Sequence, residues 1–188
     1  MIKMVIVTAT LVGLISTNCF ALEFGIGIGA NDYDRTIYVP INITNNFRTE
    51  LSLGYSSNDR KSATDSEANF YDGYSIETGI GLFFLKDVYE KTQIYYGCRL
   101  LYINGESKWN YSSGYNYNDK SSGYGIVPTF GVEYLITDHF SLGGEIEFFY
   151  TNLNGKTEES YPDTDTVSYD TNSTSSGTNG RVVLRYYF

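Results

Sequence analysis

The sequence predicts an all-β fold: a closed antiparallel barrel of eight strands that crosses a membrane, with an apolar outer surface and a polar, filled interior. Three observations predict it. Apolar and polar residues alternate in eight segments, short and long connections alternate between them, and aromatic residues mark both ends of the apolar face. The composition agrees, because Tyr 19, Phe 11 and Gly 19 against Pro 3 and Met 2 favour strands over helices.

Charge and hydropathy exclude two classes of protein. The formal net charge of −9 argues against nucleic-acid binding, which needs clustered Lys and Arg on the phosphates. No apolar run approaches the roughly 18–20 residues of a spanning helix, so a helical membrane protein is excluded. The mean hydropathy of −0.26 suits a membrane barrel, whose alternating strands average to mild values.

The first 21 residues predict a cleaved secretory signal peptide, followed by one barrel domain at 22–188. Lys3 precedes an apolar run at 4–15, and residues 16–21 form a polar end that closes on Ala21. A buried first helix and lipidation of Cys19 are the alternatives. After cleavage only Cys98 remains, so no intramolecular disulfide is expected.

Four strand pairs follow along the chain, at 22–30 with 36–44, 49–56 with 73–85, 92–103 with 123–136, and 140–152 with 180–188. Short connections fall at 45–48, 86–91 and 137–139, and longer ones at 31–35, 57–72, 104–122 and 153–179. This alternation is expected when the two rims of a barrel face different compartments. Pro40 and Pro128 interrupt strands, and each predicts a bulge.

One face of every strand is apolar, and the other carries glycine, small polar residues and the charged set Glu23, Glu50, Glu77, Arg99, Glu133, Glu145, Glu147, Arg181 and Arg185. Alternation alone leaves open whether the apolar face points into a core or out to lipid. If the charges lie inside, glycines make room for them and they pair as structural filling. The acids exceed the arginines, so some glutamates are expected near a wet rim or protonated.

The aromatic residues favour an outward apolar face. Tyr74 and Phe84, like two other such pairs, stand ten residues apart, or roughly 33 Å along a strand and roughly 25 Å across a membrane when tilted. Girdles of such rings belong at membrane interfaces. At the long-connection rim the sequence predicts Tyr55, Tyr74, Tyr102, Tyr124 and Tyr150; at the short-connection rim it predicts Phe24, Phe84, Tyr134, Phe140, Tyr186 and Phe188.

The hairpin "GVEYLITDHFSLGGEIEF" (131–148) and the terminal "RVVLRYYF" (181–188) resemble the small eight-stranded outer-membrane barrels of the OmpA and OmpX type, in a barrel-only form. The resemblance implies the outer membrane of a Gram-negative bacterium, with the short connections periplasmic. It implies lipid and lipopolysaccharide as surroundings, and Tyr186 with Phe188 as the signal for the barrel assembly machinery.

The sequence predicts no enzyme and no cofactor. Related lipid-modifying enzymes and proteases need His with Ser or Asp at the outer rim, whereas His139 lies in a short connection. Glu145 and Glu147 suit acid–base chemistry by type, but a filled barrel offers them no cleft.

Recognition by the long connections is the predicted function. Trp109, Tyr111, Tyr115 and Tyr117 are the candidates, because Tyr among Ser, Gly and Asn is typical of recognition loops. Solvated, variable loops are the alternative. Asp163, Asp165 and Asp170 suggest a Ca²⁺ site, without the spacing of a known calcium loop. We expect adhesion, host or envelope contact, or envelope integrity; a narrow channel or carrier for small or hydrophobic molecules is the alternative.

Overall fold

The computed structural model describes residues 22–31, 35–64, 67–111, 113–162 and 164–188, without the side chains of 58–69. The expected signal peptide and Cys19 therefore lie outside the described residues. The described part of the chain contains no helix long and apolar enough to cross a membrane.

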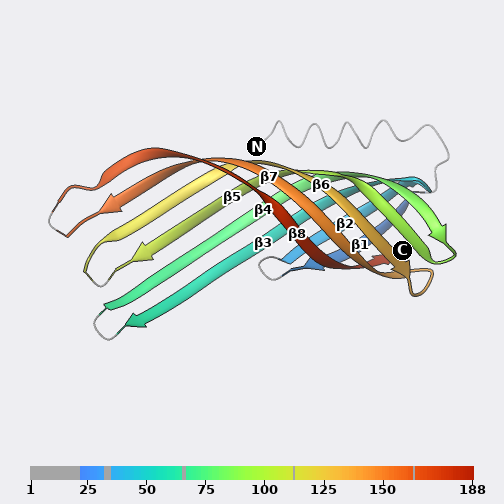
Figure 1. Ribbon diagram of the computed structural model, residues 1–188, viewed down its shortest axis with the longest axis horizontal. Coiled ribbons are helices and arrows are strands. Elements are labelled where there is room, and N and C mark those ends of the chain that lie inside the picture. Colours follow the sequence, from blue (N-terminus) through green and yellow to red (C-terminus); the bar gives the residue numbers. More distant parts are fainter. Residues whose placement is uncertain (1–21, 32–34, 65–66, 112, 163) are drawn as a thin grey trace.

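The predicted fold class is confirmed. Eight antiparallel strands close into one ring in sequence order, each paired with its neighbours along the chain, and β1 pairs with β8 (Figure 1). The strands are β1 Glu23–Ala30, β2 Arg35–Thr44, β3 Phe47–Thr64, β4 Glu67–Tyr89, β5 Thr92–Asn110, β6 Asn116–Leu135, β7 Phe140–Ser160 and β8 Val167–Tyr187.

The register fixes the tilt of the strands. A path that starts at Val182 of β8 and moves from each residue to its pairing partner on the next strand passes through Ala30 and returns to β8 at Asn172, the partner of Asn154. Asn172 is ten residues from Val182, so the strands of the closed ring are staggered by ten residues in total. With spacings of about 3.3 Å along and 4.8 Å between strands, this stagger gives a tilt of about 41°. At that tilt, the two aromatic girdles lie roughly 25 Å apart along the barrel axis, the height of a membrane's apolar band.

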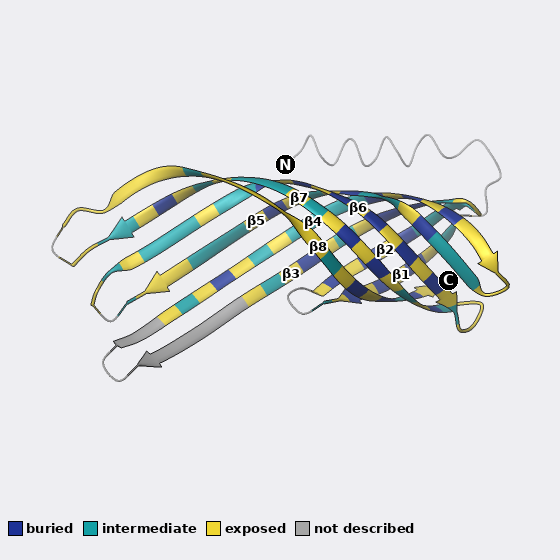
Figure 2. Ribbon diagram, in the orientation of Figure 1, coloured by how far each residue is buried: buried dark blue, intermediate teal, exposed yellow. Residues whose placement is uncertain are grey.

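The strands turn their apolar side chains outward. Ile28, Leu100 and Val182 are each more than half exposed, whereas Glu50 and Arg185 of the opposite parity are 0% and 1% exposed. The same alternation of buried and exposed positions continues around the ring (Figure 2). The barrel therefore has an apolar outside and a largely polar inside, and the predicted filling of the inside holds for only part of the lumen.

The predicted strand bounds are wrong at the outer rim. Residues expected as long connections continue the strands: β3 pairs with β4 to Thr64↔Glu67, β5 with β6 to Asn110↔Asn116, and β7 with β8 to Glu159↔Val167. Their Ser, Thr, Asn and Tyr side chains carry no apolar face, yet the backbone hydrogen bonds continue. Apolar alternation marked the membrane edge rather than the strand end.

The extended segments form one curved sheet beyond the barrel, which we call the protruding sheet: 57–64 of β3, 67–73 of β4, 104–110 of β5, 116–122 of β6, 153–160 of β7 and 167–173 of β8. Its three hairpins project at the left of Figure 1. The hairpin of β1 and β2 ends at the barrel, because β1 stops at Ala30 and β2 begins at Arg35.

The bulges predicted at the prolines are also wrong. Pro40 stands in continuous register with Glu50, and Pro128 with Cys98. Neither proline donates a backbone hydrogen bond, but the pairing resumes in the same register on either side. The register shifts instead near the short connections, between Asn42 and Thr44 and between Asp87 and Tyr89.

Candidate functional site

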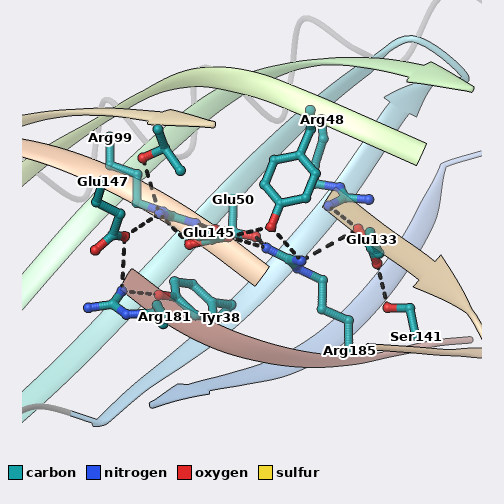
Figure 3. A network of polar contacts seen from close by, with 12 residues as sticks. Tyr38, Arg48, Glu50, Arg99, Glu133, Ser141, Glu145, Glu147, Arg181 and Arg185 are labelled. Atoms are coloured by element: carbon teal, nitrogen blue, oxygen red, sulfur yellow. Dashed lines mark hydrogen bonds and ion pairs between the residues drawn. The ribbon is translucent and has the colours of Figure 1, made fainter. Parts of the chain in front are cut away.

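A charged network of buried side chains fills the middle of the barrel (Figure 3). We call it the central network. It contains, among the described residues, Arg48 and Glu50 of β3, Arg99 of β5, Glu133 of β6, Glu145 and Glu147 of β7, and Arg181 and Arg185 of β8. Inward parity on five strands brings these groups together, and the four arginines balance the four glutamates.

Arg99 lies at the centre of the outer half of this network. Its Nη2 lies 2.7 Å from Glu50 Oε1 and 2.9 Å from Glu145 Oε1, and its Nη1 lies 2.7 Å from Glu147 Oε1. Its guanidinium also lies 4.9 Å from the ring centroid of Phe83. Three carboxylates and an aromatic face therefore surround a cation that is 2% exposed.

Arg185 connects this half to the half on the side of the short turns. Its Nη2 lies 3.1 Å from Glu50 Oε2 and 2.9 Å from Glu145 Oε1, while its Nη1 lies 3.4 Å from Glu133 Oε2. Arg48 approaches the same Glu133 oxygen at 2.9 Å. Glu50, Glu133 and Glu145 are each shared by two arginines, so the charges are compensated as a group rather than in separate pairs.

Hydroxyl groups complete the hydrogen bonding of the glutamates. Tyr95 donates to Glu145 Oε1 at 2.6 Å, Tyr187 donates to Glu133 Oε1 at 2.8 Å, and Ser141 donates to the same Glu133 oxygen. Tyr38 hydrogen-bonds the Arg181 guanidinium. A buried charge is tolerated only with good partners. Because the glutamates and arginines have such partners, the network suits a structural role as filling of the lumen.

Seven of the nine predicted interior charges lie in the central network. Glu23 lies apart at the rim of the short turns, where Asn42 Nδ2 donates to it at 2.6 Å, and Glu77 lies above the network on the side of the long hairpins. Sequence reasoning missed Arg48, which it assigned to a short connection. Arg48 shares parity with Glu50, and that signal was available in the sequence.

Aromatic rings were also missed on the inward face. Tyr38, Phe83, Tyr95 and Tyr187 are buried in the lumen. The glycines on this face make room for rings as well as for charges: a Cβ on Gly131 would lie 2.2 Å from the Tyr95 ring. Strand alternation separates inside from outside, but it does not predict which interior positions hold rings.

A cavity of about 340 Å³ lies above the central network, and we call it the vestibule. Arg99, Glu147, Arg181 and Tyr38 form its floor. Its remaining lining comes from inward-facing residues of β2 through β8 together with Asn31 after β1. The vestibule is therefore the outer half of the lumen, left unfilled by the network.

An aromatic cluster lies at the far end of the protruding sheet. Ring centroids are 4.4 Å apart for Tyr71 and Trp109, 6.4 Å for Trp109 and Tyr111, 5.2 Å for Tyr111 and Tyr115, and 4.9 Å for Tyr115 and Tyr161. These five residues form the tip cluster. It contains three of the four predicted recognition candidates, and the fourth, Tyr117, pairs with Trp109 across the β5–β6 ladder.

Glu159 accepts hydrogen bonds from two tyrosines beside this cluster, Tyr169 at 2.6 Å and Tyr161 at 3.1 Å. The Tyr169 bond, followed by the Tyr161 bond, holds the pKa of Glu159 below its usual 4.5. The Glu159 carboxylate in turn raises the pKa of Tyr169 to about 12. These bonds are therefore complete above pH 4.5, weaken as pH falls through the lowered carboxyl pKa, and are lost again as pH rises through about 12.

Glu159→Gln is expected to return the Tyr169 pKa toward 10, since the neutral amide no longer favours the protonated phenol. Titration of tyrosinate absorbance, as a difference against Tyr169→Phe, measures this shift. Glu158→Gln, a neighbouring exposed carboxylate, is the matched control and leaves the titration unchanged. An unchanged Tyr169 titration in Glu159→Gln would contradict the assigned bond.

The predicted girdle residues face outward at both rims. At the end with the short turns the Phe188 amide donates to the Phe24 carbonyl at 2.9 Å, and the Tyr186 and Phe188 ring centroids are 5.4 Å apart. His139 lies in the β6–β7 turn, where its Nδ1 is 3.0 Å from the Tyr187 carbonyl oxygen. Asp163 of the calcium hypothesis lies outside the described residues. The described residues contain no metal-binding group of three or more His, Cys, Asp or Glu.

Comparison with models of known protein families finds no match, and comparison with curated protein sequences finds none either. Solved structures do match. A major outer membrane protein from Thermus thermophilus aligns with a TM-score of 0.70 at 10% identity, over 89% of this chain and 100% of that one.

Two further structures have the same architecture. The outer membrane protein OprG from Pseudomonas aeruginosa aligns with a TM-score of 0.58 at 10% identity, over 89% of this chain and 94% of that one. Ail, the attachment invasion locus protein of Yersinia pestis, in complex with the heparin analogue sucrose octasulfate, aligns at 0.50 and 13% identity, over 89% and 95%. Likeness at such identities shows the fold, and the fold of this chain is that of the small eight-stranded outer-membrane β-barrels of the OmpA and OmpX type.

Proposed function

We propose that this chain is a non-enzymatic protein of a Gram-negative outer membrane, exported by a cleaved signal peptide, whose protruding sheet makes surface contacts in adhesion, host or envelope contact. The observation that carries the proposal is the sheet itself. Six strands continue past the outer aromatic girdle and place the tip cluster roughly 20 Å beyond it. Connecting barrel strands requires only a few residues.

The chemistry of the sheet suits a contact surface. Trp and Tyr give large contact areas at low entropy cost, and they are enriched where binding energy concentrates. Trp109 and Tyr161 are 38% and 46% exposed, so they are available to a partner. The acidic balance of the chain favours a neutral or cationic partner over a sulfated one such as the heparin analogue bound by Ail.

The β8 edge offers a second mode of contact. Beyond its last β1 pair, Ala30↔Val182, β8 pairs within the described residues with β7. The segment from Thr171 to Gly180 is rich in Ser, Thr and Asn, and an exposed edge of this kind is a template for an added strand of a partner.

Cell adherence tests the proposal. Cells displaying the full chain are measured for binding to extracellular-matrix surfaces and to like cells, in a strain that otherwise does not adhere. We expect Trp109→Ala combined with Tyr161→Ala to reduce the binding affinity more than tenfold, because truncating such anchors costs about 1–2 kcal/mol each. Tyr89→Ala, an exposed ring at the opposite rim, is the control. Equal adherence by parent and tip variant on every surface would overturn the proposed role of the cluster.

A narrow channel or carrier is the second candidate, and the vestibule favours it as a place for a small ligand. The central network counts against continuous permeation, because it fills the lumen below the vestibule. In planar bilayers we therefore expect no steady single-channel openings from the full chain. Steady openings would show that the central network does not block the lumen of the working protein.

Under this proposal, outer-membrane lipid and lipopolysaccharide surround the girdles, and the barrel assembly machinery recognises the last strand at Tyr186 and Phe188. Nucleic acid is not a partner.

A further inference from the structure

One wall of the vestibule is apolar, although the interior of a membrane barrel is ordinarily polar. Leu101 and Ile103 of β5, Val127 of β6, and Phe149 and Leu153 of β7 form this wall. The facing wall from β2 to β4 is polar and includes Thr36, Ser52, Ser56, Ser75 and Glu77. A half-apolar cavity of about 340 Å³ lies within the range of small-molecule sites, about 300–1,000 Å³.

A groove lies on the lipid-facing side of the same part of the barrel. Two glycines are exposed along it: a Cβ on Gly180 would meet nothing within 4 Å, and one on Gly144 would meet only the Arg181 carbonyl at 4.0 Å. Larger apolar side chains border the groove, namely Phe130, Val132, Ile146 and Val182. It is therefore an apolar hollow in a surface that contacts lipid.

The vestibule and the groove adjoin at the end of β1, where Asn31, Asn179 and Arg181 line both of them. The last β1–β8 pair is Ala30↔Val182, and outward of it the described part of β8 is paired on its β7 side. We call this place the lateral mouth. At the tilt derived above, it lies roughly 5–10 Å below the outer girdle, at the depth of the outer leaflet.

We propose that the vestibule binds a single-chain amphiphile of the fatty-acid type, which enters from the outer leaflet through the lateral mouth. In a ring of eight strands β5 stands opposite β1, so the apolar residues of β5 face the mouth. The amphiphile's chain contacts the apolar wall, and the Asn179 amide hydrogen-bonds its polar end. This activity rests on the carrier candidate and names its ligand class; it is independent of surface contact, since it uses the lumen and does not involve the tip cluster.

Bromine quenching in lipid nanodiscs tests this inference on the full chain. Trp109→Phe removes the single tryptophan, and Phe149→Trp then places a reporter on the apolar wall; Leu153→Trp, nearer the rim, is the second reporter. The probe is dibrominated stearic acid dissolved in the bilayer. We expect saturable quenching by this probe and little quenching by a two-chain phospholipid carrying the same bromines, because the barrel wall separates the reporter from bulk lipid.

A pair of outward-facing substitutions locates the path of entry. Gly180→Phe adds a ring in the groove at the mouth, where a Cβ on Gly180 would meet nothing within 4 Å, whereas Thr78→Phe adds the same ring at a similar depth on the outward face of β4. We expect Gly180→Phe to raise the half-quenching concentration by about tenfold, which corresponds to about 1.4 kcal/mol, and Thr78→Phe to leave it unchanged. Quenching by aqueous acrylamide is expected to be equal in both, because the outer end of the vestibule is untouched.

Three results would overturn the inference. Absence of saturable quenching in both reporters would show that the vestibule does not take this ligand. Equal effects of Gly180→Phe and Thr78→Phe would show that the ligand does not pass the mouth. Equal quenching by the two-chain phospholipid would show that the reporter senses bulk lipid. Only variants that fold are compared. Folding is shown by a gel band whose mobility shifts on heating.

Discussion

Replacing Arg99 with methionine is expected to lower the free energy of unfolding by about 3–5 kcal/mol. Methionine retains much of the side-chain volume but leaves Glu50, Glu145 and Glu147 without the guanidinium that lies within 3 Å of each of them. Their charges stay in a desolvated lumen, and this uncompensated burial causes the loss. Urea unfolding in lipid vesicles, followed by the heat-dependent shift of the folded band, measures it.

Two further variants separate the effect of burying a charge from the effect of changing the number of charges. Lys108→Met removes an exposed ion pair, Lys108 Nζ to Glu106 Oε1 at 3.2 Å, and is expected to cost less than about 1 kcal/mol. Arg99→Met combined with Glu145→Gln is expected to cost less than the sum of the two single changes, since one orphaned charge is neutralised. A loss in Arg99→Met no larger than that in Lys108→Met would contradict a desolvated network.

Ile146→Arg is expected to destabilise the barrel by about 2–4 kcal/mol, the cost of a cation on the lipid face near the bilayer midplane. Ile146 is 50% exposed on β7, six residues from the girdle residue Phe140 and four from the girdle residue Tyr150. On a surface that faced water, an exposed isoleucine would accept arginine at little cost. The same urea unfolding measurement therefore reports which phase surrounds the barrel.

Tyr124→Arg is the matched control, because Tyr124 faces outward at the girdle. Near an interface arginine reaches water, so the expected cost is about 0–1 kcal/mol. Equal costs at the two depths would contradict a membrane around the band.

Much of the fold could be predicted from the sequence because strand geometry forces side chains to alternate. Phe24, Ile26 and Ile28 take one side of the wall, and the ten-residue spacing from Tyr74 to Phe84 indicates that this side is outside. Strand ends could not be predicted. In a segment such as 171–180, both faces are polar, and pairing with β7 extends it as a strand.

The sequence predicts which residues belong to the central network better than it predicts how they are arranged in space. Inward parity identifies Glu50, Arg99 and Arg185, but the ten-residue stagger of the closed ring brings them into one part of the lumen. No local pattern encodes that stagger. The apolar wall of the vestibule was missed for a related reason. Leu101 and Phe149 are apolar, but they lie on the inward strand face, which was identified by its polar residues.

The six residues that join β1 to β8, Gly25–Ala30 against 182–187, have a consequence for assembly. All other neighbouring strands are joined through a turn, and such hairpins form quickly because their ends are close along the chain. The β1–β8 contact requires the two ends of the barrel sequence to meet, and with six pairs it is one of the two shortest ladders among the described strands. Ring closure is therefore expected to be the slow last step of folding, and the amides of this ladder to exchange with solvent before those of the long hairpins.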